Sequence, residues 1–217
     1  DFLEYMKLDP YFRKFNHNKM TFGITYCTSE NFILVLSHDE VVHLKCSMIN
    51  KMPGEYEDKF ANLKVGYTFM LGHPGKKLLF MGQDFGQFHE WDEKVSLDWY
   101  LTKEPFHADL QNYVKGLLTL YHKYPALYRL DEEYDGFQWI NANDGDRSIF
   151  SFIRRDETQK KNLLFICNFT PVDRDDYRVG VPKRGTYTLL LDQEHGYYKR
   201  GDKISHYRSI KSECDGQ

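Results

Sequence analysis

The sequence predicts two kinds of structure in succession, an α/β region followed by an all-β region. In the first half, two short apolar runs are each followed by a polar loop and a helical pattern, which is typical of βα units around a parallel sheet. From Gly136 onward, short β-rich runs separated by turn signals replace that pattern and predict an antiparallel β-sandwich. We therefore divide the chain into residues 1–124 and residues 125–217, with the change of character near residues 124–136.

The α/β half is predicted from two kinds of periodicity. Residues 31–37 (NFILVLS) and 77–81 (KLLFM) are continuous apolar runs, which is typical of strands buried on both faces. Apolar residues at helical spacing predict a helix over residues 55–71 that ends at Gly72, Pro74 and Gly75. In chain order we expect the end of a helix at 1–7, a strand at 31–37, a helix at 55–71, a strand at 77–81 and a helix at 108–124.

The all-β half is predicted from runs of β-branched and aromatic residues between turns. The expected strands are residues 137–140, 148–154, 163–168, 177–181 and 186–191. Asn143-Asp144-Gly145 and Lys183-Arg184-Gly185 are the clearest turn signals. Apolar residues on both faces of residues 148–154 predict a strand that is mostly covered. The charged tail from about Lys199 is expected to be an edge strand or disordered.

Composition narrows the classes of partner. The formal net charge of −3 gives no basic excess for a nucleic acid or an anionic membrane, and no apolar run approaches the roughly 20 residues of a membrane span. The four cysteines fit neither a metal site nor a disulfide framework, so we expect free thiols in a cytoplasmic protein. A start at Asp1, without Met or signal peptide, favours a fragment or a processed form.

The most informative segment follows the first expected strand. His38, Asp39 and Glu40 come directly after a run that should hold the backbone rigidly, and in a barrel of βα units such positions face the active site. An Asp there can accept hydrogen bonds from sugar hydroxyls, which tighten as the ring flattens toward an oxocarbenium ion, and a neighbouring His can donate to the same hydroxyls. Scattered metal ligands or a solvated loop would explain the triplet equally well.

A resemblance separates these readings. SHDEVVH (residues 37–43) is similar to the fourth conserved region of the α-amylase superfamily, and most similar to its branching-enzyme version. Further segments of that resemblance follow in the same order: KMPG, FANL, GHPGKKLLFMG, QDFGQ, EW, SLDW, NFTPV and YRVGVP. The chain thus resembles the C-terminal portion of a 1,4-α-glucan branching enzyme, which implies the last two βα units of a (β/α)8 TIM barrel followed by a C-terminal β-sandwich.

The resemblance also implies roles. Asp39 would be the third catalytic carboxylate, which binds and distorts the sugar, and His38 would stabilise the transition state. The reaction implied is transfer of an α-1,4 glucan segment to a 6-hydroxyl, with an α-glucan as partner and neither cofactor nor metal. The nucleophilic Asp and the acid/base Glu would lie upstream of Asp1, so we expect the 217-residue chain alone to be inactive.

The expected substrate-binding residues lie in the two loops, and some depart from the family pattern. They are Trp91, Glu90, Asp84 and His43. Asp84 stands where many members have Glu, and Leu44-Lys45 stands where Gly-Lys is frequent. Trp91 could instead be a packing residue, and His43 an ordinary loop histidine.

Two other functions stay open: a glucan-binding or structural module, and a fragment of an amylase-type hydrolase. The isolated chain would have to cover the open strand edges of a partial barrel by docking the sandwich, by self-association or by disorder.

Overall fold

The computed structural model describes residues 1–197 and 209–211. In chain order the helices are α1 Phe2–Met6, α2 Pro10–Arg13, α3 Asn18–Thr21, α4 Tyr56–Gly72 and α5 Pro105–Lys123. The strands are β1 Ile33–Leu36, β2 Lys76–Leu79, β3 Phe137–Asp144, β4 Ile149–Arg154, β5 Leu163–Asn168, β6 Thr186–Thr188, β7 Leu191–Asp192, β8 Gly196–Tyr197 and β9 Ser209–Lys211. Short 3₁₀ turns connect many of these elements.

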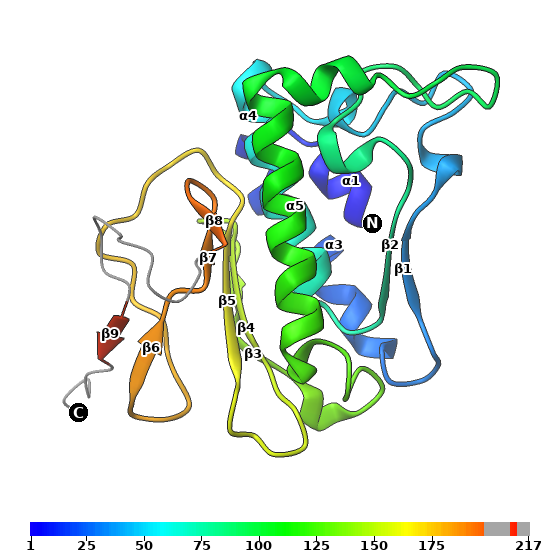
Figure 1. Cartoon of the computed structure of the whole chain (residues 1–217). Coiled ribbons are helices and arrows are strands. Elements are labelled where there is room, and N and C mark those ends of the chain that lie inside the picture. Colours follow the sequence, from blue (N-terminus) through cyan, green and yellow to red (C-terminus); the bar gives the residue numbers. More distant parts are fainter. Residues whose placement is uncertain (198–208, 212–217) are drawn as a thin grey trace.

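The long helices form the middle layer of the molecule. Figure 1 shows α4 and α5 side by side, with β1 and β2 on one side of them and the sheet of β3, β4 and β5 on the other. One apolar core runs through these layers, because buried side chains of α1, α4, α5 and of the three-stranded sheet belong to the same cluster. The helix and sheet are in close contact at Gly72 of α4, where an added Cβ would lie 2.7 Å from Cζ of Phe152 in β4.

Both predicted long helices are confirmed, and the sequence explains their ends. Helix α4 begins after Glu55, whose side chain forms a capping box with Asp58, and it ends at Gly72 before a residue in extended conformation and Pro74. Helix α5 starts at Pro105, three residues earlier than expected, because proline fits the first turn of a helix.

The two strands of the first half pair in parallel, but the expectation that both are buried on two faces is wrong. β1 and β2 run in register from Ile33 opposite Lys76 to Leu36 opposite Leu79. Alternate side chains point to opposite faces of a strand. In β1 only Leu34 and Leu36 face the helices, whereas Ile33 is 57% and Val35 46% exposed. A continuous apolar run therefore did not indicate two covered faces in this part of the chain.

The second half contains antiparallel sheets, as expected. β4 is buried at every position and pairs with β3 and β5, which confirms the prediction of a covered strand at 148–154. The prediction of a strand at 177–181 is wrong: this segment joins β3 through the hydroxyl of Tyr177, which donates to Asp144 at 2.8 Å, without strand pairing. The expected strand at 186–191 is divided into β6 and β7, which pair with β9 and β8 respectively.

Three of the cysteines and the tail can be compared with expectation. Cys27, Cys46 and Cys167 are free thiols, as predicted, whereas Cys214 lies outside the described residues. Of the tail from Lys199 on, residues 209–211 form the edge strand β9 and the remainder lies outside the described residues. Within residues 1–197 and 209–211 no helix has the length and apolar character needed to cross a membrane.

Candidate functional site

The candidate site lies where β1 and β2 end. Because the two strands are parallel and in register, their carboxyl ends lie at one edge of the sheet. The backbone N–H of Phe80 donates to the carbonyl of Leu36 at 3.1 Å, so the first residues beyond both strands stay adjacent. The loops that follow contain all six residues expected at the site. Figure 1 shows both loops beyond the same ends of β1 and β2.

His38 and Asp39 lie side by side on a short turn directly after β1. Ser37 caps the 3₁₀ turn His38–Glu40, because its hydroxyl accepts a hydrogen bond from the N–H of Asp39 at 3.3 Å. Nε2 of His38 lies 3.3 Å from Oδ1 of Asp39. The side chains are 51% and 71% exposed, so both can reach a ligand from solvent.

Trp91 is brought to this pair by the second loop. Its backbone N–H donates to the carbonyl of Val41 at 3.0 Å, which fixes the indole beside the first loop. The ring of Trp91 meets Phe80 edge to face at 5.1 Å and lies 6.1 Å from the ring of His38. Phe80 in turn lies 5.8 Å from His38. These three rings form a half-exposed aromatic group next to Asp39.

Glu90 of the second loop binds the main chain of the first loop, directly after His43. The two carboxylate oxygens of Glu90 accept hydrogen bonds from the backbone N–H groups of Leu44, at 3.0 Å, and Cys46, at 2.6 Å. His43 is exposed and has a φ of 55°, in the left-handed region that residues with side chains rarely adopt. Glu90 thus contacts the loop that contains His43 through that loop's main chain.

Asp84 is held by a neighbouring helix. It lies in the 3₁₀ turn Gln83–Phe85, between two glycines with positive φ, 82° at Gly82 and 68° at Gly86. Its Oδ2 accepts a hydrogen bond from Nε2 of Gln111 in α5 at 3.0 Å, which turns the carboxylate toward that helix. The structure thus brings His38, Asp39 and Trp91 together, links Glu90 to the loop of His43 through main-chain contacts, and gives Asp84 a contact with α5 instead.

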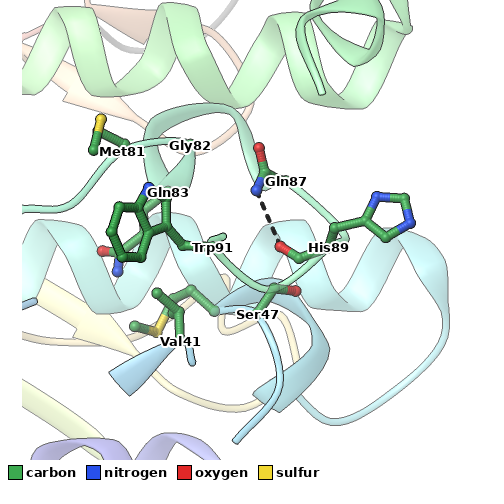
Figure 2. Close-up of a pocket in the computed structure, with 9 residues that line it drawn as sticks. Val41, Ser47, Met81, Gly82, Gln83, Gln87, His89 and Trp91 are labelled. Atoms are coloured by element: carbon green, nitrogen blue, oxygen red, sulfur yellow. Dashed lines mark hydrogen bonds between the residues drawn. The ribbon is translucent and has the colours of Figure 1, made fainter. Parts of the chain in front are cut away.

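A small hollow lies beneath Trp91 (Figure 2). Its volume of about 10 Å³ leaves room for roughly one water molecule. Figure 2 shows Gln87 donating to the backbone carbonyl of His89, while the ring of His89 points away from the other lining residues. A sugar ring cannot enter a hollow of this size.

Two lysines and one phenylalanine of the site were missed by the sequence analysis. Nζ of Lys45 donates to the backbone carbonyl of Asp39 at 2.7 Å, and Nζ of Lys51 contacts the carbonyl of Lys45. Burial lowers the pKa of Lys51, and the repulsion of Lys7 acts in the same direction. Phe80 could have been found from the expected parallel pairing. Within the described residues, no group of three or more His, Cys, Asp or Glu side chains could hold a metal ion.

Comparison with known proteins matches this chain along nearly its whole length. Residues 139–217 match the family model of the alpha amylase, C-terminal all-beta domain. The 1,4-alpha-glucan branching enzyme GlgB of Butyrivibrio fibrisolvens is 56% identical over 220 residues, which cover 99% of this chain and 34% of that enzyme. A relative of the same name from Aquifex aeolicus is 50% identical, and the match covers 91% of this chain and 31% of that relative. A relative of the same name from Bacillus mycoides is 48% identical, and the match covers 96% of this chain and 32% of that relative.

Among solved structures, the crystal structure of an alpha-amylase from H. orenii aligns with 82% of this chain and 36% of that chain. The identity is 13% and the TM-score 0.43, a likeness too weak to carry an inference. The chain spans about a third of the length of the curated relatives it matches. Over nearly its whole length, this chain is related to the 1,4-alpha-glucan branching enzymes.

Proposed function

We propose that this chain supplies the substrate-gripping side of the active site of a 1,4-α-glucan branching enzyme. The observation that carries the proposal is the exposed pair His38 and Asp39 at the end of β1, with Trp91 beside it. In this proposal the whole enzyme cleaves an α-1,4 bond by double displacement and transfers the released segment to a 6-hydroxyl. The nucleophile and the proton donor come from outside the 217 residues, the ligand is an α-glucan, and the compartment is the cytoplasm.

The chemistry of the pair fits this part of the reaction. Each carboxylate oxygen accepts about two hydrogen bonds. One oxygen of Asp39 lies near His38 and the other lies 3.5 Å from the hydroxyl of Ser37, so both retain capacity for sugar hydroxyls. Bonds to those hydroxyls strengthen as the ring approaches the oxocarbenium-like transition state. In the proposal His38 donates to a neighbouring hydroxyl, and the negative charge of Asp39 favours the positive charge that develops on the sugar ring.

The remaining expected residues surround this pair. Trp91 offers an aromatic face to a glucosyl unit, in the way that aromatic side chains combine an apolar body with defined geometry. Glu90, His43 and Asp84 belong to the same binding surface in the proposal. The contacts of Glu90 with the first loop support a place at the site, and the bond between Asp84 and Gln111 supports a more peripheral one for Asp84.

The proposal extends to the architecture. β1 and β2 would be the last two strands of a (β/α)8 barrel within residues 1–124, and residues 125–217 would form the C-terminal β-sandwich. The exposed Ile33 and Val35 support a further covering layer over β1 in the whole enzyme. In the isolated chain, self-association would cover the same face.

Titration of the 217-residue chain with maltoheptaose tests the proposed site. We expect the wild-type chain to bind, and we expect Asp39→Asn to weaken binding by about tenfold or more, because a hydrogen bond to a charged group is lost. Glu93→Gln is the matched control, since Glu93 is an exposed acid of the second loop that we place outside the site. The chain alone should leave the iodine stain of amylose unchanged. Binding that Asp39→Asn and Glu93→Gln weaken equally would contradict the proposal.

A further inference from the structure

The two loops of the site are joined to each other by polar contacts that involve the main chain. Trp91 donates its N–H to the carbonyl of Val41 at 3.0 Å, and Nδ2 of Asn50 donates to the carbonyl of Phe88 at 2.8 Å. The carboxylate of Glu90 makes the central contact, with two backbone N–H groups of the first loop. The position of the first loop therefore depends on the second, and Glu90 is the charged residue between them.

Glu90 compensates an unfavourable backbone. His43, Leu44 and Cys46 have φ values of 55°, 66° and 67°, a conformation that disfavours residues with a Cβ. The N–H groups of Leu44 and Cys46 point toward one carboxylate, as backbone N–H groups do in a concave anion site. The Glu90 carboxylate occupies this site, with N···O distances of 3.0 and 2.6 Å. Without the carboxylate, the N–H groups of Leu44 and Cys46 would lose their acceptor, and nothing would offset the unfavourable left-handed backbone of this turn.

The same turn is connected to Asp39 by Lys45. Lys45 lies between the two residues that Glu90 binds, and its Nζ donates to the backbone carbonyl of Asp39 at 2.7 Å. The carbonyl of Lys45 is in turn contacted by Nζ of Lys51, which is only 8% exposed. A path of direct contacts thus leads from Glu90 through residues 44–46 to the main chain of Asp39.

We propose that Glu90 is a positioning residue, whose carboxylate fixes residues 43–46 and, through Lys45, the backbone of Asp39. The role rests on the proposed function, because it is Asp39 that contacts the glucan. Glu90 then acts on substrate binding without touching the sugar, which replaces the direct contact given to it in the proposed function. This differs from direct contact, in which Glu90 would add its own hydrogen bond to a hydroxyl, and the two roles predict different results when Glu90 and Asp39 are changed together.

The first measurement concerns the loop and does not depend on the proposed function. Amide hydrogen exchange of the full 217-residue chain should show Leu44 and Cys46 protected, and Glu90→Ala should accelerate their exchange by about tenfold or more. Glu90→Gln keeps one acceptor and should give an intermediate rate, which preserves the test if Glu90→Ala folds poorly. Glu93→Ala is the matched control and should leave both rates unchanged. Equal exchange in Glu90→Ala and wild type would overturn the proposal.

The second measurement tests whether the contact between Glu90 and the first loop affects the affinity for substrate. We expect Glu90→Ala to weaken maltoheptaose binding, and we expect the double variant Glu90→Ala/Asp39→Asn to bind no more weakly than Asp39→Asn alone. Additive losses would show direct contact and overturn the positioning role, as would accelerated exchange with unchanged affinity. Failure of the wild-type chain to bind maltoheptaose would refute the proposed function, and the positioning role with it, even where the exchange result confirms the contact between the loops.

Discussion

Replacement of Arg154 by Met should destabilise the junction between the two halves of the chain. Arg154 is fully buried and donates three hydrogen bonds: to the carbonyl of Gly72 at 2.9 Å, to the carbonyl of Gly136 at 3.1 Å, and to Oδ1 of Asp131 at 2.7 Å. These partners lie at the end of α4, in the turn before β3 and in the preceding connection. A single side chain therefore satisfies polar groups from three segments that meet near the start of β2.

The magnitude follows from what the change leaves behind. Asp131 is 5% exposed and would keep an ion pair only with the largely exposed Lys76, at 3.0 Å, among the described residues. Removing one member of a buried ion pair costs about 3–5 kcal/mol, because the other charge stays buried. Since domains are stable by about 5–15 kcal/mol, this is a large fraction of the free energy of unfolding. With a urea dependence of about 2 kcal/mol per M, the midpoint should fall by roughly 2 M.

Urea unfolding followed by far-UV circular dichroism measures this effect. Arg155→Met is the matched control. Arg155 is the next residue in the chain, and among the described residues its side chain forms a hydrogen bond only with Gln138. We expect that control to lose about 1 kcal/mol at most. Adding Asp131→Leu to Arg154→Met should restore part of the loss, since the unpaired buried charge is then removed. Equal midpoints for Arg154→Met and Arg155→Met would refute the reasoning.

Three further outcomes are expected. Gly72→Ala should lower the midpoint of thermal unfolding by several degrees, at a cost of about 1–3 kcal/mol, because the new Cβ would lie 2.7 Å from Phe152; an unchanged midpoint would contradict the packing. Burial lowers the pKa of His73 from 6.5 to about 4, so as the pH falls His73 is protonated in the unfolded chain before it is protonated in the folded chain. The free energy of unfolding should therefore fall by roughly 3 kcal/mol between pH 6.5 and pH 4. His73→Gln should flatten that part of the pH profile in urea titrations, and an identical profile would refute the assignment. Trp91→Ala should weaken maltoheptaose binding roughly three- to tenfold in a calorimetric titration, whereas Trp99→Ala, at an exposed position of the same loop, should not; equal losses would count against a specific platform.

The sequence predicted local structure well where one segment decides it alone. The helix at Tyr56–Gly72 follows from apolar spacing, from the acidic residues at its start and from the Gly, His and Pro at its end. The exposure of Ile33 and Val35 could not be predicted, because an apolar run does not say which faces of a strand are covered. The prediction of a strand at 177–181 was wrong for a related reason. Strand pairing depends on a partner in space, and Tyr177 contacts β3 through its hydroxyl instead.

The same distinction holds at the site. The proximity of His38 and Asp39 could be predicted, because they are neighbours in sequence after a strand. Phe80 was predictable in principle from the parallel register, which places it beside the residues after Leu36. The contacts of Glu90 with the first loop could not be predicted, because they need left-handed backbone at residues 43, 44 and 46, and no glycine in that segment signals such a turn.

Branching activity of a chimeric enzyme tests the central claim most directly. In the chimera, this chain replaces the segment of the Butyrivibrio fibrisolvens relative that aligns with it at 56% identity. Debranching of the amylose product should release new short chains, which shows transfer to 6-hydroxyls. Before debranching, the number of reducing ends should not rise as it would if the enzyme hydrolysed the amylose. We expect Asp39→Asn in the chimera to lower this activity by about a hundredfold or more, and Glu93→Gln to leave it unchanged. A folded chimera that branches equally well with Asn at position 39 would contradict the account.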